Sequence, residues 1–372
     1  MKKSVLKSLP IFFTALVLLF GCQKNIRDNP LTDSGGSNKD FPPQQLKVFM
    51  EVNLVADNSM FSPQLLNPNL VNARNVTFSP SGTAFVSVEN MGTSMRFMTD
   101  GQPAGSSLTI PFSGGETGHS NPTGQVFNYS SGFLLPNGNP AQIIFACKHG
   151  TICGWNSGST AVQMIANASA TSNLGITMAN NGINSFIYVA NFAQNRIDVY
   201  NSQWNLVNMP FTDPNLPADY SPLNVSSLSD GKIYVAYAKK TASGGIETGN
   251  GNGYVNVFSP NGVLLQRFAS KGKLNAPYGI VKAPALFWGI TSVIQNKILV
   301  GNTGDGRINV FDESGDYLGQ LATQGQTLEV DGLWGMSFPP DGIYNSNYLY
   351  FAARPGDGAH GVFGYVKSKT LN

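Results

Sequence analysis

A short phrase, an Asn or Gly followed by an apolar strand, returns six times along this chain and limits its fold more than any other feature. The copies follow one another at intervals of 49 to 56 residues, at Asn75, Gly124, Gly175, Asn224, Gly279 and Gly335. Each interval holds several short β-rich runs, and a period of about 40 to 50 residues built in this way is typical of propeller blades. The repeat therefore predicts an all-β, six-bladed propeller with four-stranded blades.

The strand pattern of a blade is clearest in the third and fifth repeats. Residues 186–200 form a strand, a polar turn and a second strand with period-two alternation, and residues 297–312 repeat that order. The last repeat lacks an outer strand after Val366, whereas the largely apolar stretch 48–56 precedes the first repeat. We expect this N-terminal stretch to supply the missing strand and close the ring, which would leave no free sheet edge.

The composition fits one large folded unit, which we place at residues 47–368. Hydrophobic residues make up 41% of the chain, and its 41 Gly and 22 Pro indicate many tight turns. Charged residues are only 12% of the chain, the formal net charge is +2, and no basic patch stands out. We therefore do not expect nucleic acid as a partner. We also expect a monomer.

The first 21 residues have the pattern of a signal peptide. Three lysines precede an apolar run, residues 9–20, that is too short to span a membrane. The following residues 19–22 resemble the lipobox of bacterial lipoproteins, in which the Cys, here Cys22, is acylated. Two or three acyl chains are enough to hold a soluble domain on a bilayer. The alternative is a plain secreted protein in which Cys22 has no such role.

Residues 22–46 are expected to form a flexible tether. From Gln23 to Lys39 they carry Asn, Asp, Ser and Gly with almost no apolar residue, so they cannot bury enough surface to order the chain. Gln23 follows the Cys where an inner-membrane retention signal often carries Asp. The predicted location is therefore the bacterial cell envelope, as an outer-membrane lipoprotein with a periplasmic or surface-facing domain.

Several phrases carry a family resemblance. Residues 195–200 and 304–312 resemble NHL repeats, the blade motif of many six-bladed propellers. Further phrases, at 211–217, 234–239, 251–253, 264–268, 274–277, 331–335 and 360–364, are similar to an uncharacterised family of exported NHL-like propellers. The resemblance covers roughly residues 50 to 366 and implies the fold, but no activity.

The gluconolactonase group of related propellers implies a different function, hydrolysis of lactones with a divalent metal at the channel mouth. Its metal site uses a Glu from the first inner strand. Here that strand, residues 74–78, has no acidic residue and begins with Arg74. A hydrolase would therefore need an altered metal site, drawn from Asp219, Asp305, Asp331 and loop Asn residues.

Propeller geometry places the candidate binding residues on the loops around one end of the channel. A rigid scaffold positions such loops, which is why binding residues collect there. The candidates in this chain are Arg74, Asn121, Asn173, Asp219, Tyr220, Asn275, Tyr278, Asp331 and Trp334. Trp334 beside Asp331 could stack a sugar or an aromatic ligand, or it could pack between blades. Arg74 would suit an anionic group or a surface salt bridge, and the Asn residues could instead cap turns.

Catalytic motifs are absent from the sequence. It shows no spaced Ser or Cys nucleophile with His and acid partners, no zinc-type His pair and no phosphate loop. Residues 312–316 lack the full set of oxygen ligands of a calcium loop, so calcium is only a minor alternative and no cofactor is expected. The sequence thus favours a module that binds a carbohydrate, peptide or protein partner over a metal-assisted hydrolase.

Cys147 and Cys153 flank a predicted hairpin turn at residues 149–150. A three-residue connection from His149 to Thr151 would place them opposite each other, whereas a two-residue connection would place them on opposite faces of the sheet. An exported compartment permits oxidation. Both a disulfide and a pair of buried free thiols therefore remain open.

Overall fold

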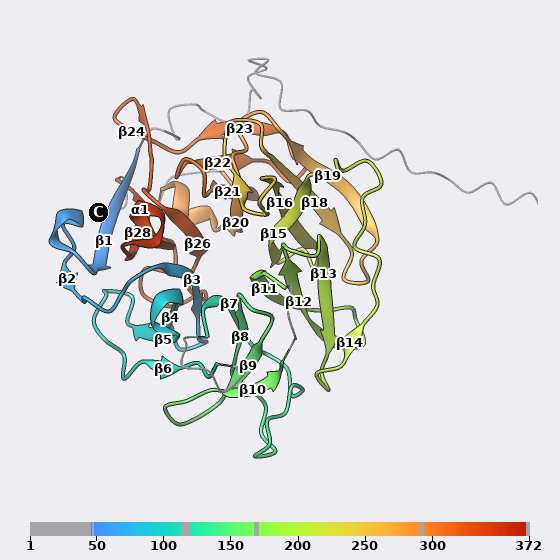
Figure 1. The fold of residues 1–372 in the computed structure, drawn as a ribbon. Helices are drawn as coiled ribbons and strands as arrows, with labels where there is room; N and C mark the ends of the chain where they lie inside the picture. Colours follow the sequence, from blue (N-terminus) through green and yellow to red (C-terminus); the bar gives the residue numbers. More distant parts are fainter. Residues whose placement is uncertain (1–45, 47, 113–119, 167–170, 290–293, 370–372) are drawn as a thin grey trace, which may run out of the picture.

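The structure, a computed structural model, forms a ring of six antiparallel sheets (Figure 1). It describes residues 46, 48–112, 120–166, 171–289 and 294–369. Six inner strands surround the centre of the ring, and each sheet extends outward from its inner strand. The predicted six-bladed propeller is therefore confirmed.

The first three blades follow the chain from inside to outside. Blade 1 contains β3 (Ala73–Phe78), β4 (Ala84–Val88), β5 (Thr93–Phe97) and β6 (Leu108–Thr109). Blade 2 contains β7 (Pro122–Phe127), β8 (Ile143–Cys147), β9 (Ile152–Trp155) and β10 (Val162–Ile165). Blade 3 contains β11 (Asn173–Asn180), β12 (Ser185–Asn191), β13 (Arg196–Asn201) and β14 (Leu206–Val207).

The next two blades keep this order and add short hairpins. Blade 4 contains β15 (Tyr220–Ser227), β16 (Ile233–Lys240), β18 (Gly253–Phe258) and β19 (Leu264–Ser270), with β17 (Ile246–Glu247) paired to β16. Blade 5 contains β20 (Pro277–Ala283), β21 (Lys297–Asn302), β22 (Ile308–Phe311) and β23 (Tyr317–Gln320). A hairpin of β24 (Ala322–Thr323) and β25 (Gln326–Thr327) follows blade 5.

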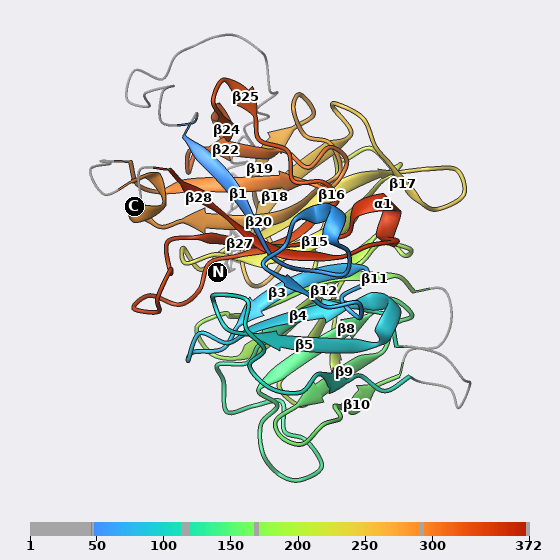
Figure 2. The same cartoon turned by 90° about the vertical axis from the view of Figure 1, so that its left-hand side faces the viewer.

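Blade 6 joins the two ends of the described chain. Its first three strands are β26 (Leu333–Ser337), β27 (Leu349–Ala353) and β28 (Val362–Ser368), and its fourth is β1 (Phe49–Ala56), which is antiparallel to β28. β2 (Leu65–Leu66) lies outside β1, and Figure 2 shows β1 beside β28. The N-terminal strand therefore closes the ring as predicted.

A polar contact reinforces this closure just beyond β1. Asp57 accepts a hydrogen bond from the backbone N–H of Gly361 at 3.1 Å, and its other oxygen lies 2.8 Å from Nδ1 of His360. His360 and Gly361 follow the short helix α1 (Pro355–Gly358), between the second and third strands of blade 6. The closing segment is thus held to blade 6 by both strand pairing and side-chain contacts.

The folded unit includes the last residue of the expected tether. Leu46 is buried in the core between blades 5 and 6, where it packs with residues such as Leu321. The predicted signal peptide, Cys22 and the rest of the tether lie outside the described residues. None of the helices in the described ranges is long and apolar enough to cross a membrane.

Each inner strand carries a β-bulge immediately before the Asn or Gly of the repeat. The pairing with the second strand shifts there by one residue, and in blade 5 the shift spans Tyr278 and Gly279. A bulge leaves one residue unpaired and re-aims its side chain. We call the six residues before the repeat position the bulge ring: Arg74, Thr123, Leu174, Leu223, Tyr278 and Trp334.

Close approach of neighbouring inner strands explains the small residue after the bulge. A Cβ atom on Gly175 would collide with Oδ1 of Asn224 in the next blade. Asn224 in turn donates from Nδ2 to the backbone oxygen of Tyr278 at 2.9 Å, so one side chain links blades 3, 4 and 5. The repeat that identifies the fold is therefore a packing requirement at the ring centre.

Candidate functional site

The loops of the propeller emerge on two faces. We call the upper face the one with the loops between the second and third strands of each blade and the loops that lead from one blade to the next. In Figure 2 this face, which carries α1 and β17, is at the right. The lower face carries the loops between first and second strands and between third and fourth strands. All the candidate residues were expected at the upper face.

Side chains of the bulge ring fill the channel near the upper face. Leu174, Leu223, Tyr278 and Trp334 belong to one buried cluster, in which Tyr278 is 0% and Trp334 is 4% exposed. The Tyr278 hydroxyl donates across the ring to the backbone oxygen of Leu174 at 2.6 Å. Burial raises the pKa of Tyr278 to about 12, so this hydroxyl stays a donor at neutral pH. The channel, which the sequence analysis expects to be open at this face, is therefore filled by side chains of the bulge ring.

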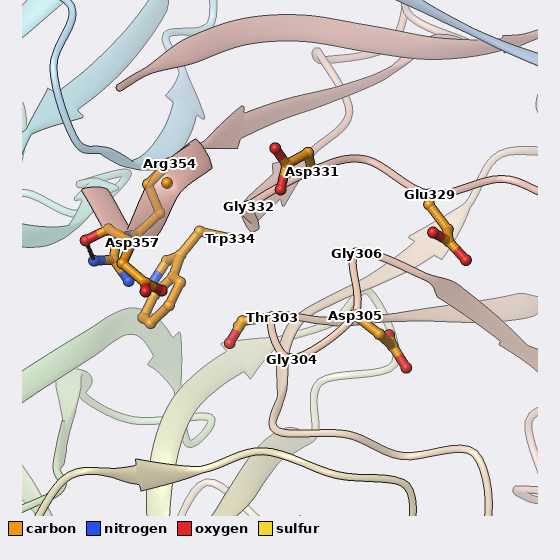
Figure 3. A pocket seen from close by; sticks show the side chains of 11 residues that line it. Thr303, Gly304, Asp305, Gly306, Glu329, Asp331, Gly332, Trp334, Arg354 and Asp357 are labelled. Carbon is orange, nitrogen blue, oxygen red and sulfur yellow. Dashed lines mark hydrogen bonds between the residues drawn. The ribbon is translucent and has the colours of Figure 1, made fainter. Parts of the chain in front are cut away.

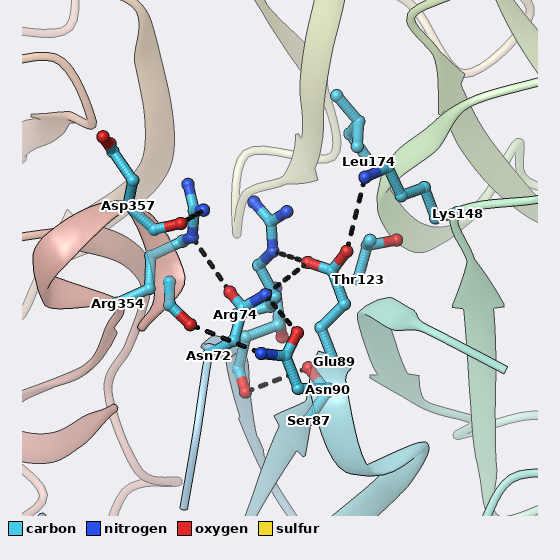
Figure 4. A network of polar contacts seen from close by, with 12 residues as sticks. Asn72, Arg74, Ser87, Glu89, Asn90, Thr123, Lys148, Leu174, Arg354 and Asp357 are labelled. Carbon is cyan, nitrogen blue, oxygen red and sulfur yellow. Dashed lines mark hydrogen bonds and ion pairs between the residues drawn. The ribbon is translucent and has the colours of Figure 1, made fainter. Parts of the chain in front are cut away.

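Arg74 covers the ring of Trp334 instead of pointing to solvent. Its guanidinium carbon lies 4.2 Å from the centroid of the Trp334 ring, and its Nε pairs with the carboxylate of Glu89 (Figure 4). Both members of this ion pair are buried. Burial raises the pKa of Glu89, but the charge and hydrogen bond of Arg74, together with Lys148 and Arg354, outweigh it and lower this pKa. Glu89 is therefore ionised at neutral pH.

A second arginine completes this cationic group. The guanidinium carbon of Arg354 lies 5.1 Å from the centroid of the Trp334 ring, and its Nε donates to Oδ1 of Asn72 at 2.9 Å. Burial and then the charge of Arg74 lower the pKa of Arg354 to about 10. Because Arg354 comes from blade 6 and Asn72 from the start of blade 1, the network ties the last blade to the first. The main role of this network is to hold blades 1 and 6 together.

Trp334 is 4% exposed, so little of its ring is left to stack on a sugar or an aromatic ligand. Its other interpretation, packing between blades, describes the structure: Tyr278 of blade 5 packs against it with ring centroids 5.0 Å apart. Likewise, Arg74 forms a buried ion pair rather than a surface salt bridge or a free anion site. Arg74, Tyr278 and Trp334 thus lie buried at the ring centre rather than free at an open mouth, and each stands at a bulge position.

Most of the other candidates support neighbouring loops. Asn275 accepts a hydrogen bond from the backbone N–H of Gly249 at 2.7 Å and donates to Asp305 at 3.2 Å. Tyr220 is buried against Tyr254, and Asn173 is 1% exposed. The side chain of Asn275 thus ties loops together, whereas Oδ1 of Asn173 is buried without a hydrogen-bond partner among the described residues.

Asn121 and Asp219 remain accessible but lie apart from the pocket described next. Asn121 adopts a left-handed backbone conformation, with φ of 51°, and its carbonyl accepts from the N–H of Lys148. This agrees with the expectation that loop Asn residues shape turns. Asp219 is exposed, and its carbonyl accepts from the N–H of Lys240.

A pocket of about 530 Å³ does open on the upper face, between blades 5 and 6 (Figure 3). Its walls are the loop after β21, the loop before β26 and the loop after β27. We call it the upper pocket, and its lining residues with side chains are Thr303, Asp305, Glu329, Asp331, Trp334, Arg354 and Asp357. Of the expected binding residues, only Asp331 and Trp334 line it.

Carboxylates dominate the lining of the upper pocket. Glu329 is paired with Arg307 at 2.7 Å, and Asp305 accepts from Asn275. Asp331 and Asp357 are exposed, and their carboxylates have no hydrogen-bond or ion-pair partner among the residues that the structure describes. Arg354 is the cation of the lining. The sequence showed the Asp-Gly turns at Asp305 and Asp357, but nothing in it marked Glu329 or Arg354.

The carboxylates do not gather into a metal centre. Within the described ranges, no group of three or more His, Cys, Asp or Glu is arranged to hold a metal ion. Asp219, one of the acids from which an altered metal site would be built, does not line the upper pocket with Asp305 and Asp331.

The two cysteines are free and buried, and no disulfide joins them. The connection in this hairpin runs from Lys148 to Gly150, so Cys147 lies opposite Thr151 and Cys153 lies opposite Phe145. The two thiols are therefore diagonal neighbours rather than directly opposed. A hydrogen bond between them, and burial, raise the pKa of Cys147. The alternative of buried free thiols describes this structure.

Comparison with known proteins identifies relatives by sequence. No family model matches the chain. Uncharacterized protein L690 of Acanthamoeba polyphaga mimivirus is 31% identical over 264 residues, which cover 67% of this chain and 68% of that protein. Uncharacterized protein R648 of the same virus is 30% identical over 258 residues, which cover 66% and 62%, respectively. The chain thus spans about two thirds of the length of these relatives.

Solved structures that resemble this one share little sequence with it. A streptogramin B lyase aligns with a TM-score of 0.50 at 13% identity, covering 86% of this chain and 97% of the lyase. A gluconolactonase from Xanthomonas campestris aligns with a TM-score of 0.49 at 14% identity, covering 81% and 87%. At this identity the likeness to the lyase shows the propeller fold alone.

Proposed function

We propose that this chain is a binding module that holds a positively charged peptide segment in the upper pocket. The chain belongs to the same family as the uncharacterized mimivirus protein L690. The observation that supports this proposal most is the pair of exposed carboxylates, Asp331 and Asp357, which face one cavity of about 530 Å³ without a partner among the described residues.

The charge of the pocket favours a Lys or Arg side chain. Asp305, Glu329, Asp331 and Asp357 face a single lining cation, Arg354. A cleft lined by one sign of charge concentrates its field and attracts ligands of the opposite sign. Four glycines also line the walls, so a bound peptide could approach the backbone of the loops closely. A peptide therefore fits this pocket better than a carbohydrate or a flat protein surface.

Direct binding measurements test this proposal. We would titrate the purified full chain into a dye-labelled hexapeptide that contains lysine, and into matched peptides with arginine or glutamate, and record fluorescence anisotropy. The basic peptides should bind at least about tenfold more tightly than the acidic one. The double variant Asp331→Asn, Asp357→Asn should lose that preference. The control variant Asp219→Asn, which lies on the same face outside the pocket, should keep it. Equal binding of all peptides would reject the proposal.

The metal-assisted hydrolase remains the second candidate for the upper face. Its metal ligands would be drawn from Asp219, Asp305, Asp331 and the loop Asn residues, and of these acids Asp305 and Asp331 line the upper pocket. This candidate would replace the binding module if the purified protein retained about one equivalent of divalent metal and lost it in the Asp305→Asn, Asp331→Asn variant. Hydrolysis of a panel of simple lactones, present with the metal and absent after chelation, would provide the second measurement.

We also propose that acyl chains on Cys22 hold the domain at an outer membrane and that the segment before Leu46 serves as the tether. Support comes from the lipobox-like residues 19–22 and from the apolar run before them. Expression of the full chain in a bacterium with labelled palmitate should give a labelled protein in the outer-membrane fraction, and Cys22→Ala should be unlabelled. Equal labelling of the two would reject the anchor.

A further inference from the structure

A second large pocket opens on the lower face, between blades 2 and 3. It has a volume of about 580 Å³, and we call it the lower pocket. Three loops form it: the β7–β8 loop, the β11–β12 turn and the β13–β14 turn. None of these loops contributes to the upper pocket or to the charged network around Glu89. Any ligand held here is therefore bound independently of those groups.

Two aromatic residues in unusual backbone conformations support this pocket: Trp204 lines it, and Phe133 is buried against Trp204. Phe133 has φ of 57° and Trp204 has φ of 66°. Left-handed backbone is unfavourable for bulky side chains, and such residues cluster at functional sites. Among the described residues with positive φ, these are the two aromatic ones. Their rings pack edge to face with centroids 5.1 Å apart, although they come from different blades.

Hydrogen bonds hold the two loops in this arrangement. The indole N–H of Trp204 donates to the carbonyl of Leu134 at 2.9 Å, and the backbone N–H of Phe133 donates to the carbonyl of Ser202 at 2.8 Å. Because the indole nitrogen is already satisfied, Trp204 offers a ligand its ring rather than a donor. The pocket wall is thus pre-organised across the blade boundary, which lowers the cost of binding.

The polar groups of the lower pocket are all uncharged. Its lining contains no Asp, Glu, Lys, Arg or His. The side chains of Ser131, Asn184, Ser202 and Gln203 have no hydrogen-bond partner in the part of the chain that the structure describes. Hydroxyl and amide groups can both donate and accept, so they suit a ligand rich in hydroxyl groups.

Apolar side chains are exposed among these polar groups. Ile183 is 84% and Leu134 is 49% exposed, and both line the pocket beside Trp204. A sugar ring presents C–H groups on its faces and hydroxyl groups on its edge. It can therefore contact an aromatic ring and aliphatic side chains while its hydroxyls pair with amides and serines. A charged ligand would find no opposite charge in this lining and would lose hydration.

From these observations, we propose that the lower pocket binds a neutral carbohydrate, either a single uncharged hexose unit or the end of an oligosaccharide. The site goes beyond the proposed peptide-binding function, because it lies on the opposite face and uses different residues. The protein would then hold a sugar on one face and a basic peptide on the other.

Saturation-transfer NMR with the full chain tests the lower pocket. The probes are neutral trisaccharides of glucose, mannose and N-acetylglucosamine, with a glucuronate trisaccharide as the charged comparison. We expect at least one neutral probe to bind with a dissociation constant of about 1 mM or tighter, and the charged probe to bind at least about tenfold more weakly. Absence of transfer to every neutral probe, or equal binding of the charged one, would overturn the proposal.

Variants locate the binding. Asn184→Ala with Gln203→Ala removes two exposed amides and should weaken the neutral probe about tenfold without a change in melting temperature. Trp204→Gly keeps the left-handed backbone favourable while it removes the ring, and should abolish binding. Asp331→Asn with Asp357→Asn is the matched control and should leave sugar binding unchanged. Sugar binding that survived both lower-pocket variants would place it elsewhere and refute the assignment. Peptide binding should be unchanged in the two lower-pocket variants, because neither touches the upper pocket.

Discussion

The upper and lower pockets have similar volumes, about 530 and 580 Å³, but opposite chemistry. Carboxylates line the upper pocket between blades 5 and 6, while hydroxyls, amides and an indole line the lower pocket between blades 2 and 3. The overall charge of +2 gives no hint of this difference. A propeller presents separate loop sets on its two faces, so each face can acquire its own binding chemistry without a change in the ring.

The two pockets also differ in what stabilises them. The upper pocket shares Arg354 and Trp334 with the buried network that plugs the channel. The lower pocket depends on one aromatic contact and two hydrogen bonds between neighbouring loops. Changes in the buried network should therefore affect the upper pocket and the whole fold, whereas changes in the lower loops should stay local.

The largest effect is expected from Glu89→Gln. This substitution removes the carboxylate that balances Arg74, and an uncompensated buried charge costs about 3–5 kcal/mol of the free energy of unfolding. Chemical denaturation would measure it. Glu313→Gln, which removes the partner of Lys282 at an exposed pair, should cost less than about 1 kcal/mol. Similar values for the two variants would show that the network around Arg74 is not structural.

The next effect is a pH dependence carried by Glu51 in the closing strand. Burial, and to a smaller extent the charge of Asp331, raises the pKa of Glu51 to about 7, although a hydrogen bond from Asn53 opposes the shift. Because the folded state binds this proton more tightly than the unfolded state, the stabilising contribution is complete below about pH 4.5 and is lost as the pH rises through about 7. The loss is at most about 3 kcal/mol.

Urea denaturation at pH 5 and pH 8 would measure this change. Glu51→Gln should retain most of its stability at the higher pH, because an amide cannot ionise. If both proteins lost stability equally over this range, other groups would be responsible for the pH dependence. Since the lower pocket has no titratable group in its lining, its affinity for sugar should not change with pH while the protein stays folded.

A smaller expected effect is that salt changes the ligand affinity of the upper pocket but not that of the lower pocket. Basic peptides should bind the upper pocket several-fold more weakly when NaCl is raised from about 0.05 to about 0.5 M, because salt screens the carboxylates. Sugar binding in the lower pocket should be almost unchanged over the same range. Titrations at the two salt concentrations would measure both, and parallel losses would contradict the assigned chemistry.

The smallest effect concerns the ion pair at the edge of the upper pocket. Arg307 holds Glu329 at 2.7 Å in an exposed pair. Arg307→Ala should free this carboxylate and improve the affinity for a basic peptide by up to about fivefold, which corresponds to the usual strength of such pairs. Glu329→Gln should weaken the same peptide. An unchanged affinity in both variants would place the bound charge away from Glu329.

Much of the fold follows from local sequence patterns. The repeat and the period-two strands predict six blades, and the missing outer strand after Val366 predicts the ring closure by β1. These features depend on spacing and alternation along the chain, so one amino-acid sequence is enough to predict them. The candidate binding site, in contrast, depends on contacts between residues that are distant in sequence. Trp334 and Asp331 stand three residues apart, yet one plugs the channel while the other faces solvent.

The bulge before each repeat position explains why the sequence did not indicate that Trp334 lies inside the channel. An extra residue reverses the side of the strand on which the following side chains lie, and its presence depends on pairing with a second strand. The same dependence on register put Cys147 opposite Thr151 rather than Cys153. The contact between Phe133 and Trp204 joins residues about 70 positions apart, and no local pattern indicated it.

By itself the sequence determined the number of blades, their strand order and the strand that closes the ring, because these depend on alternation and spacing along the chain. Only the tertiary structure decided which side chains fill the channel and which line a pocket. The physical reason is that strand register and blade-to-blade packing place a side chain inside or outside, and both are set by residues distant in sequence.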